Sequence, residues 1–167
     1  ARNGHLYFAP SNTTQILKID TSTDTVTSVG SVLSAAANKW YSAVTSKEGN
    51  VYFPSNSPSE SILKIDVSGD TTSLITSPSG GKWGSCLGVD GKIYSVSDGN
   101  VNMMVLDTTL DTAVNVSAST INGSVGVVLA TNGKMYSIPS SPNLVGVIGD
   151  EIPADKNLTL SRVRNKL

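Results

Sequence analysis

The chain has 167 residues, a formal net charge of -1, and charged side chains at only 15% of its positions. A charge this close to zero excludes the basic surface that binds nucleic acid or an anionic membrane, so we expect no nucleic-acid partner. We also expect no membrane insertion, because the longest apolar runs, such as residues 125–130, are far too short to cross a bilayer. The chain begins with Ala1 and shows no signal peptide, which predicts a processed start or a fragment of a longer protein.

In chain order, the sequence opens with three short alternating segments, at residues 3–8, 16–20 and 24–29. Gly, Asn, Asp, Pro and Ser separate them, a pattern typical of β-strands joined by turns. The same order then recurs three times, each time with one additional segment in front, beginning at Lys39, Lys82 and Ser124. Each complete unit therefore contains four predicted strands.

A tyrosine in the second segment of each unit gives the period of this repeat. The four copies are Tyr7, Tyr52, Tyr94 and Tyr136, which are 45, 42 and 42 residues apart. The third segment reads Ile-Leu-Lys-Ile-Asp at 16–20 and at 62–66, and is weaker at 103–107 and 145–150. Four-stranded antiparallel units of about 40–50 residues are typical of β-propeller blades.

The motifs Asn-Gly-x-[Ile/Val/Leu]-Tyr and Ile-Leu-Lys-Ile-Asp resemble the repeats of kelch-like β-propellers. They look most like repeats of phage and environmental sequences, where such repeats belong to virion tail or fibre proteins. The kelch double glycine occurs only once, at Gly80-Gly81. We predict an all-β chain, a β-propeller of four-stranded antiparallel blades with about four blades present. The predicted blades are approximately 1–30, 38–77, 81–118 and 123–160, followed by a basic C-terminal tail at 161–167.

The predicted strands number fifteen, because the first unit lacks the strand that begins each of the others. Three arrangements remain open. We expect a portion of a larger propeller ring, and the alternatives are a closed ring of four blades and an open sheet array completed by oligomerisation.

Most recurring residues have a structural interpretation. Trp40 and Trp83 occupy equivalent places, and we predict that they pack between blades; the alternative is that they line a binding surface. We predict half-buried tyrosines with bonded hydroxyls, and lysines Lys18 and Lys64 that are solvated or lie along an apolar wall. The recurring aspartates, such as Asp24, are predicted to cap turns, because the glycine and glutamate of an EF-hand calcium loop do not recur with them.

The sequence offers few groups for chemistry. His5 is the only histidine, so no catalytic triad or histidine zinc site is expected. Cys86 lies in an apolar segment and is predicted to be a buried, inert thiol. We therefore predict no catalytic, metal-binding or cofactor-binding residue and no cofactor.

The loops between the second and third segments are the candidate binding sites, since all four are expected on one face of a rigid scaffold. Their candidate residues are Asn12, Thr13, Asn56, Ser57, Asp98, Asn100, Ser140 and Asn143. The tail carries a candidate docking site for a neighbouring chain, formed by Arg162, Arg164 and Lys166.

From these observations we predict a structural or binding module that is not an enzyme. The resemblance implies a virion-associated tail or fibre protein, located in the extracellular particle, whose partners are other virion chains and a glycan or protein receptor on a cell surface. Several equivalent loops would make weak contacts that add up. The alternatives are a secreted or cell-surface lectin-like propeller and, third, a carbohydrate-active enzyme that uses two carboxylates.

Overall fold

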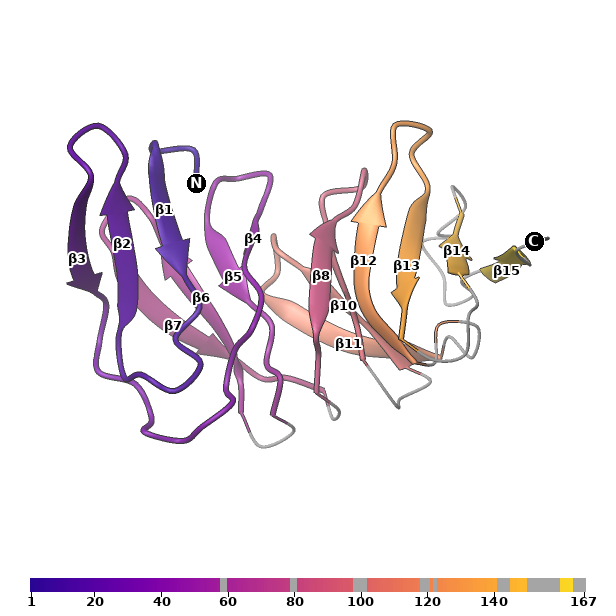
Figure 1. Cartoon of the computed structure of the whole chain (residues 1–167), viewed down its shortest axis with the longest axis horizontal. Helices are drawn as coiled ribbons and strands as arrows, with labels where there is room; N and C mark the ends of the chain where they lie inside the picture. The colour runs from indigo at the N-terminus through magenta and orange to yellow at the C-terminus, as the bar shows by residue number, and fades with distance from the viewer. Residues whose placement is uncertain are drawn as a thin grey trace.

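The computed structural model describes residues 1–57, 60–78, 81–97, 102–117, 121, 123–140 and 145–149, and the backbone of residues 160–163. These residues form fifteen strands in four antiparallel sheets (Figure 1). Within these ranges, no helical segment combines the length and the apolar character needed to span a membrane.

Each sheet follows the chain order and forms one blade. Blade 1 contains β1 (His5–Phe8), β2 (Ile16–Asp20) and β3 (Thr25–Val29). Blade 2 contains β4 (Val44–Thr45), β5 (Val51–Phe53), β6 (Ile62–Asp66) and β7 (Thr71–Ile75). Blade 3 contains β8 (Gly84–Leu87), β9 (Ile93–Val96), β10 (Asn102–Asp107) and β11 (Thr112–Ser117). Blade 4 contains β12 (Ser124–Leu129), β13 (Met135–Pro139), β14 (Val145–Ile148) and β15 (Leu160–Val163). The predicted all-β fold of repeated antiparallel blades, with the first strand of blade 1 missing, is confirmed.

The register follows from the alternation of the sequence and from its turns. Tyr7 lies opposite Lys18, and Tyr52 lies opposite Lys64, so the tyrosine and the lysine of one unit share a face of the sheet. The turn before the last strand of blades 1, 2 and 3 contains an aspartate with a positive φ, of 53°, 51° and 52°. Asp and Asn tolerate this left-handed conformation better than other residues with a side chain, which explains why Asp recurs there.

Three apolar cores lie between successive blades. Tyr7 and Ile16 of blade 1 pack against Phe53 and Leu63 of blade 2. Blades 2 and 3 share the second core and blades 3 and 4 share the third. Both faces of blades 2 and 3 are therefore covered, which explains why their third strands are apolar on both sides.

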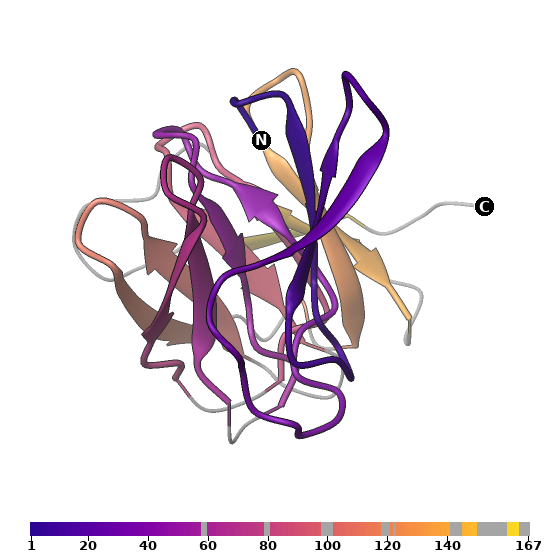
Figure 2. The ribbon, with the colours of Figure 1, turned by 90° about the vertical axis from the view of Figure 1, so that its left-hand side faces the viewer.

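The four blades follow an open arc. Blades 1 and 4 lie at opposite ends of the long axis (Figure 1), and the view along that axis shows blades 2 and 3 displaced to one side (Figure 2). The first strands β4, β8 and β12 contact one another in sequence along the inside. A Cβ on Gly84 would lie 2.5 Å from the Cα of Gly126, so the chain needs glycine where β8 meets β12. In the described residues, no apolar core joins blade 4 to blade 1, so this arc is not the closed ring of four blades.

The end of the chain differs from the expectation. We predicted that strand character ends at Leu160 and that a tail begins at residue 161. The last strand instead spans Leu160–Val163 and pairs with β14, so Arg162 belongs to a strand. An outermost strand has one unpaired edge, where charged residues are readily accommodated.

Candidate ligand-binding site

The loops between the second and third strands lie at the lower end of the blades in Figure 1. We call residues 9–15, 36–43, 54–57 and 81–83 the loop face. Its loops join neighbouring blades through the backbone: the N–H of Lys39 donates to the carbonyl of Ser11 (3.1 Å), and the N–H of Lys82 donates to the carbonyl of Ser55 (2.8 Å). The loop of one blade thus holds the start of the next blade in place.

Asn38 is the centre of a polar network on this face. It has a φ of 59°, and its N–H donates to the Oδ1 of Asn12 (2.9 Å). The hydroxyl of Tyr41 donates to the Oδ1 of Asn38 (2.5 Å), and the amide of Asn56 donates to its carbonyl (3.4 Å). Residues from two loops and one blade link are therefore held together beside an aromatic ring.

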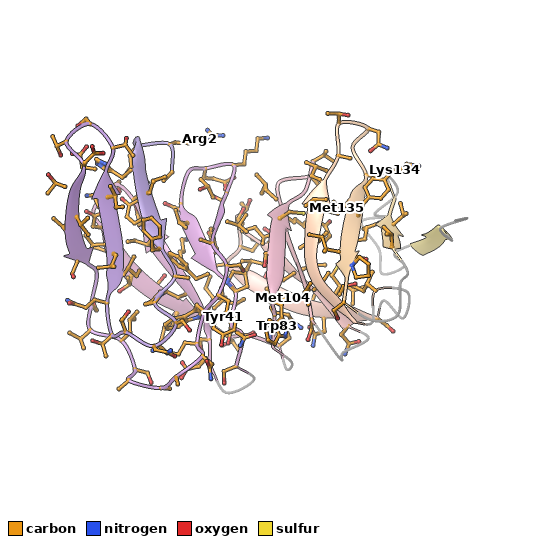
Figure 3. All side chains as sticks on the ribbon, viewed as in Figure 1. Arg2, Tyr41, Trp83, Met104, Lys134 and Met135 are labelled. Carbon is orange, nitrogen blue, oxygen red and sulfur yellow. The ribbon has the colours of Figure 1, made fainter. Side chains whose placement is uncertain are left out.

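Tyr41 and Trp83 form an exposed aromatic pair, and their rings lie close together near the lower edge of the molecule in Figure 3. Their centroids are 5.7 Å apart with an interplanar angle of 63°, an edge-to-face arrangement. Tyr41 is 42% exposed and Trp83 is 44% exposed. The predicted packing between blades is confirmed for Trp40, which is 1% exposed within the first core. For Trp83 the predicted packing between blades is wrong, because its side chain lies at the surface; a binding role stays a prediction.

Two buried lysines lie next to these aromatic residues in the chain. The ammonium of Lys39 donates to the carbonyls of Thr13 (3.1 Å) and Ala36 (2.6 Å). Among the described residues, the ammonium of Lys82 has one acceptor, the Oδ1 of Asn115, at 3.3 Å. Burial lowers the pKa of Lys82 to about 8, because its charged form is poorly solvated there.

The structure places several of the predicted site residues on the loop face. Asn12 and Thr13 are exposed, whereas Asn56 and Ser57 are half-buried. Ser140 is exposed and bonds within blade 4 to the carbonyl of Gly123. Asp98, Asn100, Asn143, Arg164 and Lys166 lie outside the described residues, as does the side chain of Arg162. A binding role for these residues stays a prediction.

The sequence reasoning missed Tyr41 and Asn38. A signal was present, because Tyr41 is the one tyrosine of five that falls outside the period of the repeat. A residue that breaks the repeat beside a recurring tryptophan is a better candidate for function than one that keeps it.

The recurring tyrosines, lysines and aspartates form a second kind of contact, which we call the clasp. The hydroxyl of Tyr7 donates to Oδ1 of Asp70 (2.8 Å), and the ammonium of Lys18 donates to Oδ2 of the same carboxylate (2.5 Å). In the next pair of blades, Tyr52 and Lys64 bind Asp111 at the same two distances. Each clasp therefore joins a blade to the one that follows it.

The clasp corrects two sequence predictions. Lys18 and Lys64 are not merely solvated or laid along an apolar wall, because each is paired with a carboxylate of the next blade. Asp70 does more than occupy a turn: burial alone would raise its pKa, but the hydrogen bonds from Lys18 and Tyr7 outweigh this and lower it. The predicted bonding of the repeat tyrosine hydroxyls holds in all four units, within the blade for Tyr94 and Tyr136. The predicted half-burial holds for Tyr136 alone, because the other three repeat tyrosines are buried.

Other polar groups of the described ranges do not assemble a metal site. No cluster of three or more His, Cys, Asp or Glu side chains there is placed to hold an ion. A small polar cavity of about 150 Å³ lies between blades 2 and 3 on the opposite face, lined by Glu48, Asp90, Lys92 and Asp107 among others. Cys86 is partly buried against the third core, and burial raises the pKa of its thiol to about 11, consistent with an unreactive thiol.

Comparison with known proteins gives a family and a fold. The model of the family described as "Repeat of unknown function (DUF6923)" matches residues 2–152. No curated protein sequence matches the chain.

Three solved structures illustrate the likeness in fold. A streptogramin B lyase is 17% identical, with a TM-score of 0.75 over 97% of this chain and 51% of the lyase. A catalytically inactive virginiamycin B lyase from Staphylococcus aureus, solved with quinupristin, is 16% identical, with a TM-score of 0.75 over 96% of this chain and 52% of the lyase. An auxiliary nutrient binding protein from Bacteroides thetaiotaomicron is 13% identical, with a TM-score of 0.69 over 95% of this chain and 38% of that protein.

These likenesses correct the prediction that the chain is not an enzyme. Two of the three structures are lyases, so this architecture does not argue against catalysis, and the prediction is contradicted. At these identities the likeness establishes the propeller-type fold. The chain spans about half the length of the lyases that it matches. The kelch and phage-tail resemblances are not confirmed.

Proposed function

We propose that this chain, which belongs to the repeat family of unknown function DUF6923, is a ligand-binding module whose ligand contacts the loop face. The observation that carries the proposal is the exposed pair formed by Tyr41 and Trp83. Tyrosine and tryptophan dominate binding surfaces because their large, rigid rings lose little conformational entropy when a partner covers them.

The surroundings of the pair favour a neutral ligand that has both an apolar face and hydroxyl groups. The described network beside the rings consists of the amide side chains of Asn12, Asn38 and Asn56. Amides both donate and accept hydrogen bonds, as a sugar hydroxyl requires, and a sugar ring presents C–H groups that pack on an aromatic face. We therefore propose a glycan as the ligand.

The fold supports such a role in a general way. One lyase structure of similar fold is solved with quinupristin, and another similar structure is a nutrient binding protein, so related architectures bind small molecules. The proposed site depends on Tyr41 and Asn38, which do not recur at the same places in the other repeat units of this chain.

Glycan binding would be tested by titrating the intact chain against a glycan array and then measuring the affinity of each hit by calorimetry. We expect Trp83→Ala to weaken binding at least about tenfold, the cost of losing an aromatic contact of about 1.5 kcal/mol. Leu110→Ala is the matched control, since Leu110 is 69% exposed in the turn between β10 and β11, away from the loop face. Equal affinities of Trp83→Ala and the parent chain would contradict the proposal.

The biological setting rests on the sequence resemblance. We propose that the module belongs to a virion tail or fibre, where it contacts a cell-surface glycan or neighbouring virion chains. Native mass spectrometry of material from its source tests this: co-purification with virion proteins is expected, and a free monomer of 17.3 kDa would contradict it.

A further inference from the structure

Blade 1 exposes a face that the other blades bury. The face that each blade turns toward its predecessor carries apolar residues from the strand with the repeat tyrosine and from the strand after it. In blade 2 these residues are Val51, Phe53 and Leu63, at 3%, 0% and 0% exposed. The residues at the same register in blade 1 are Leu6, Phe8 and Leu17, at 49%, 45% and 44% exposed. Val26, on the next strand of this face, is 56% exposed. We call Leu6, Phe8, Leu17 and Val26 the rear face of blade 1.

Blade 1 also has an aspartate, Asp24, whose backbone conformation matches that of the two clasp aspartates. Asp24 has a φ of 53°, against 51° for Asp70 and 52° for Asp111. Asp70 and Asp111 each receive a tyrosine hydroxyl and a lysine ammonium from the preceding blade. Asp24 is exposed, and among the described residues no tyrosine or lysine is bonded to it.

We propose that the rear face of blade 1, with Asp24, is the docking surface for one further blade of the same repeat in the same ring. That blade presents a tyrosine and a lysine, which bind the two oxygens of Asp24 as Tyr7 and Lys18 bind Asp70. Its apolar residues cover Leu6, Phe8 and Leu17, as blade 1 covers Val51, Phe53 and Leu63.

The chemistry favours a blade of this kind over a second copy of the chain. If a second copy of the chain continued the order of the blades, the free face of its blade 4 would meet the rear face of blade 1. It has Tyr136 at the tyrosine position, but Val147 lies opposite it where blades 1 and 2 have lysine. Among the described residues, a second copy would thus bring no lysine beside its tyrosine to bind Asp24.

The test extends the intact chain by one repeat in register. A copy of residues 38–89 is placed before Asn3, replacing Ala1 and Arg2, because Asp90-Gly91-Lys92-Ile93-Tyr94 and Asn3-Gly4-His5-Leu6-Tyr7 are equivalent. The added segment supplies a complete blade with Tyr52 and Lys64, and also the missing first strand of blade 1. Asp24→Asn is then measured in the parent and in the extended chain, because asparagine keeps the turn conformation but removes the charge.

In the extended chain we expect Asp24→Asn to lower the thermal midpoint by about 2–4 °C, and in the parent chain we expect no change. The matched control replaces the added copy of Lys64 with methionine. It should lower the thermal midpoint by the same amount, although blade 1 is unchanged. Equal shifts in both chains would overturn the proposal. Self-association of the parent chain that Leu17→Lys abolishes would overturn it as well, in favour of a second copy. Hydrogen exchange that shows the added repeat unfolded while the parent part stays folded would also contradict it.

Discussion

The dipeptide Lys-Trp begins the second repeat unit at Lys39 and the third at Lys82, yet the side chains at the two places make different contacts. Trp40 is 1% exposed and donates its indole N–H to the carbonyl of Ser61 (2.9 Å), whereas Trp83 is 44% exposed and packs against Tyr41. Lys39 has two carbonyl acceptors, and Lys82 has the single amide described above. The tryptophan of this dipeptide therefore lies in the core of one blade and at the surface of the next. The place of a residue in the repeat does not determine whether it is buried.

The largest difference should appear when each tryptophan is removed. Trp40→Ala opens a cavity in the first core and breaks the bond to Ser61, so we expect it to lower the free energy of unfolding by about 3–5 kcal/mol. Trp83→Ala should lower it by only about 1 kcal/mol, because Trp83 is already 44% exposed and loses mainly its contact with Tyr41. Chemical denaturation of both variants measures the two values. Similar losses would show that Trp83 is structural and would remove the main support for the loop-face site.

We expect a smaller difference in the free energy of unfolding when Lys39 and Lys82 are each replaced by methionine. Lys39→Met removes the two hydrogen bonds that the charged ammonium donates to the carbonyls of Thr13 and Ala36, which should cost about 1–3 kcal/mol of stability. Lys82→Met removes a poorly solvated charge and should be neutral or stabilising. Denaturation at pH 7 compares the two variants directly. A larger loss for Lys82→Met would mean that its ammonium is better compensated than the described contacts indicate.

The smallest effect is a rise in stability just above pH 8 that comes from Lys82. Because folding lowers its pKa from 10.5 to about 8, the folded chain gives up this proton at lower pH than the unfolded chain does. The free energy of unfolding should therefore rise as pH increases from about 8 toward 9. Above pH 9 the raised pKa of the Cys86 thiol opposes this rise, and above pH 10 the raised pKa values of Tyr52 and Tyr94 make the stability fall, because folding opposes the ionisation of all three groups. Denaturation between pH 7 and 9 should show the rise in the parent chain, and a flat curve in Lys82→Met.

The sequence predicted the architecture well because the fold depends on features that every copy shares. The recurring tyrosines, the third-strand pattern and the turn aspartates each follow one period, and together they gave the number and order of strands. Burial at Leu63 and exposure at Leu17 could not be told apart, since both stand in the same Ile-Leu-Lys-Ile-Asp motif and differ only in whether a blade precedes them.

The site was harder to predict because its contacts join residues that lie a repeat apart. The clasp was visible as recurring letters, but Tyr7 and Asp70 are 63 positions apart, and nothing local shows that they meet. Trp83 was placed with Trp40 because the two share a motif. Tyr41, the residue that distinguishes the loop face, lies inside its repeat unit at the position of Gly84, so a search for recurring residues passes over it.

The clasp also gives the array a polarity, since the tyrosine and lysine always lie on the earlier blade and the aspartate on the later one. A contact between two unlike surfaces sets no limit on the number of units that it joins, and it closes into a ring or grows into a filament according to the rotation between neighbours. That rotation depends on how closely the inner strands approach. At Gly84 and Gly126 the backbones lie so close that a single added methyl group would force blades 3 and 4 apart and change the rotation between them.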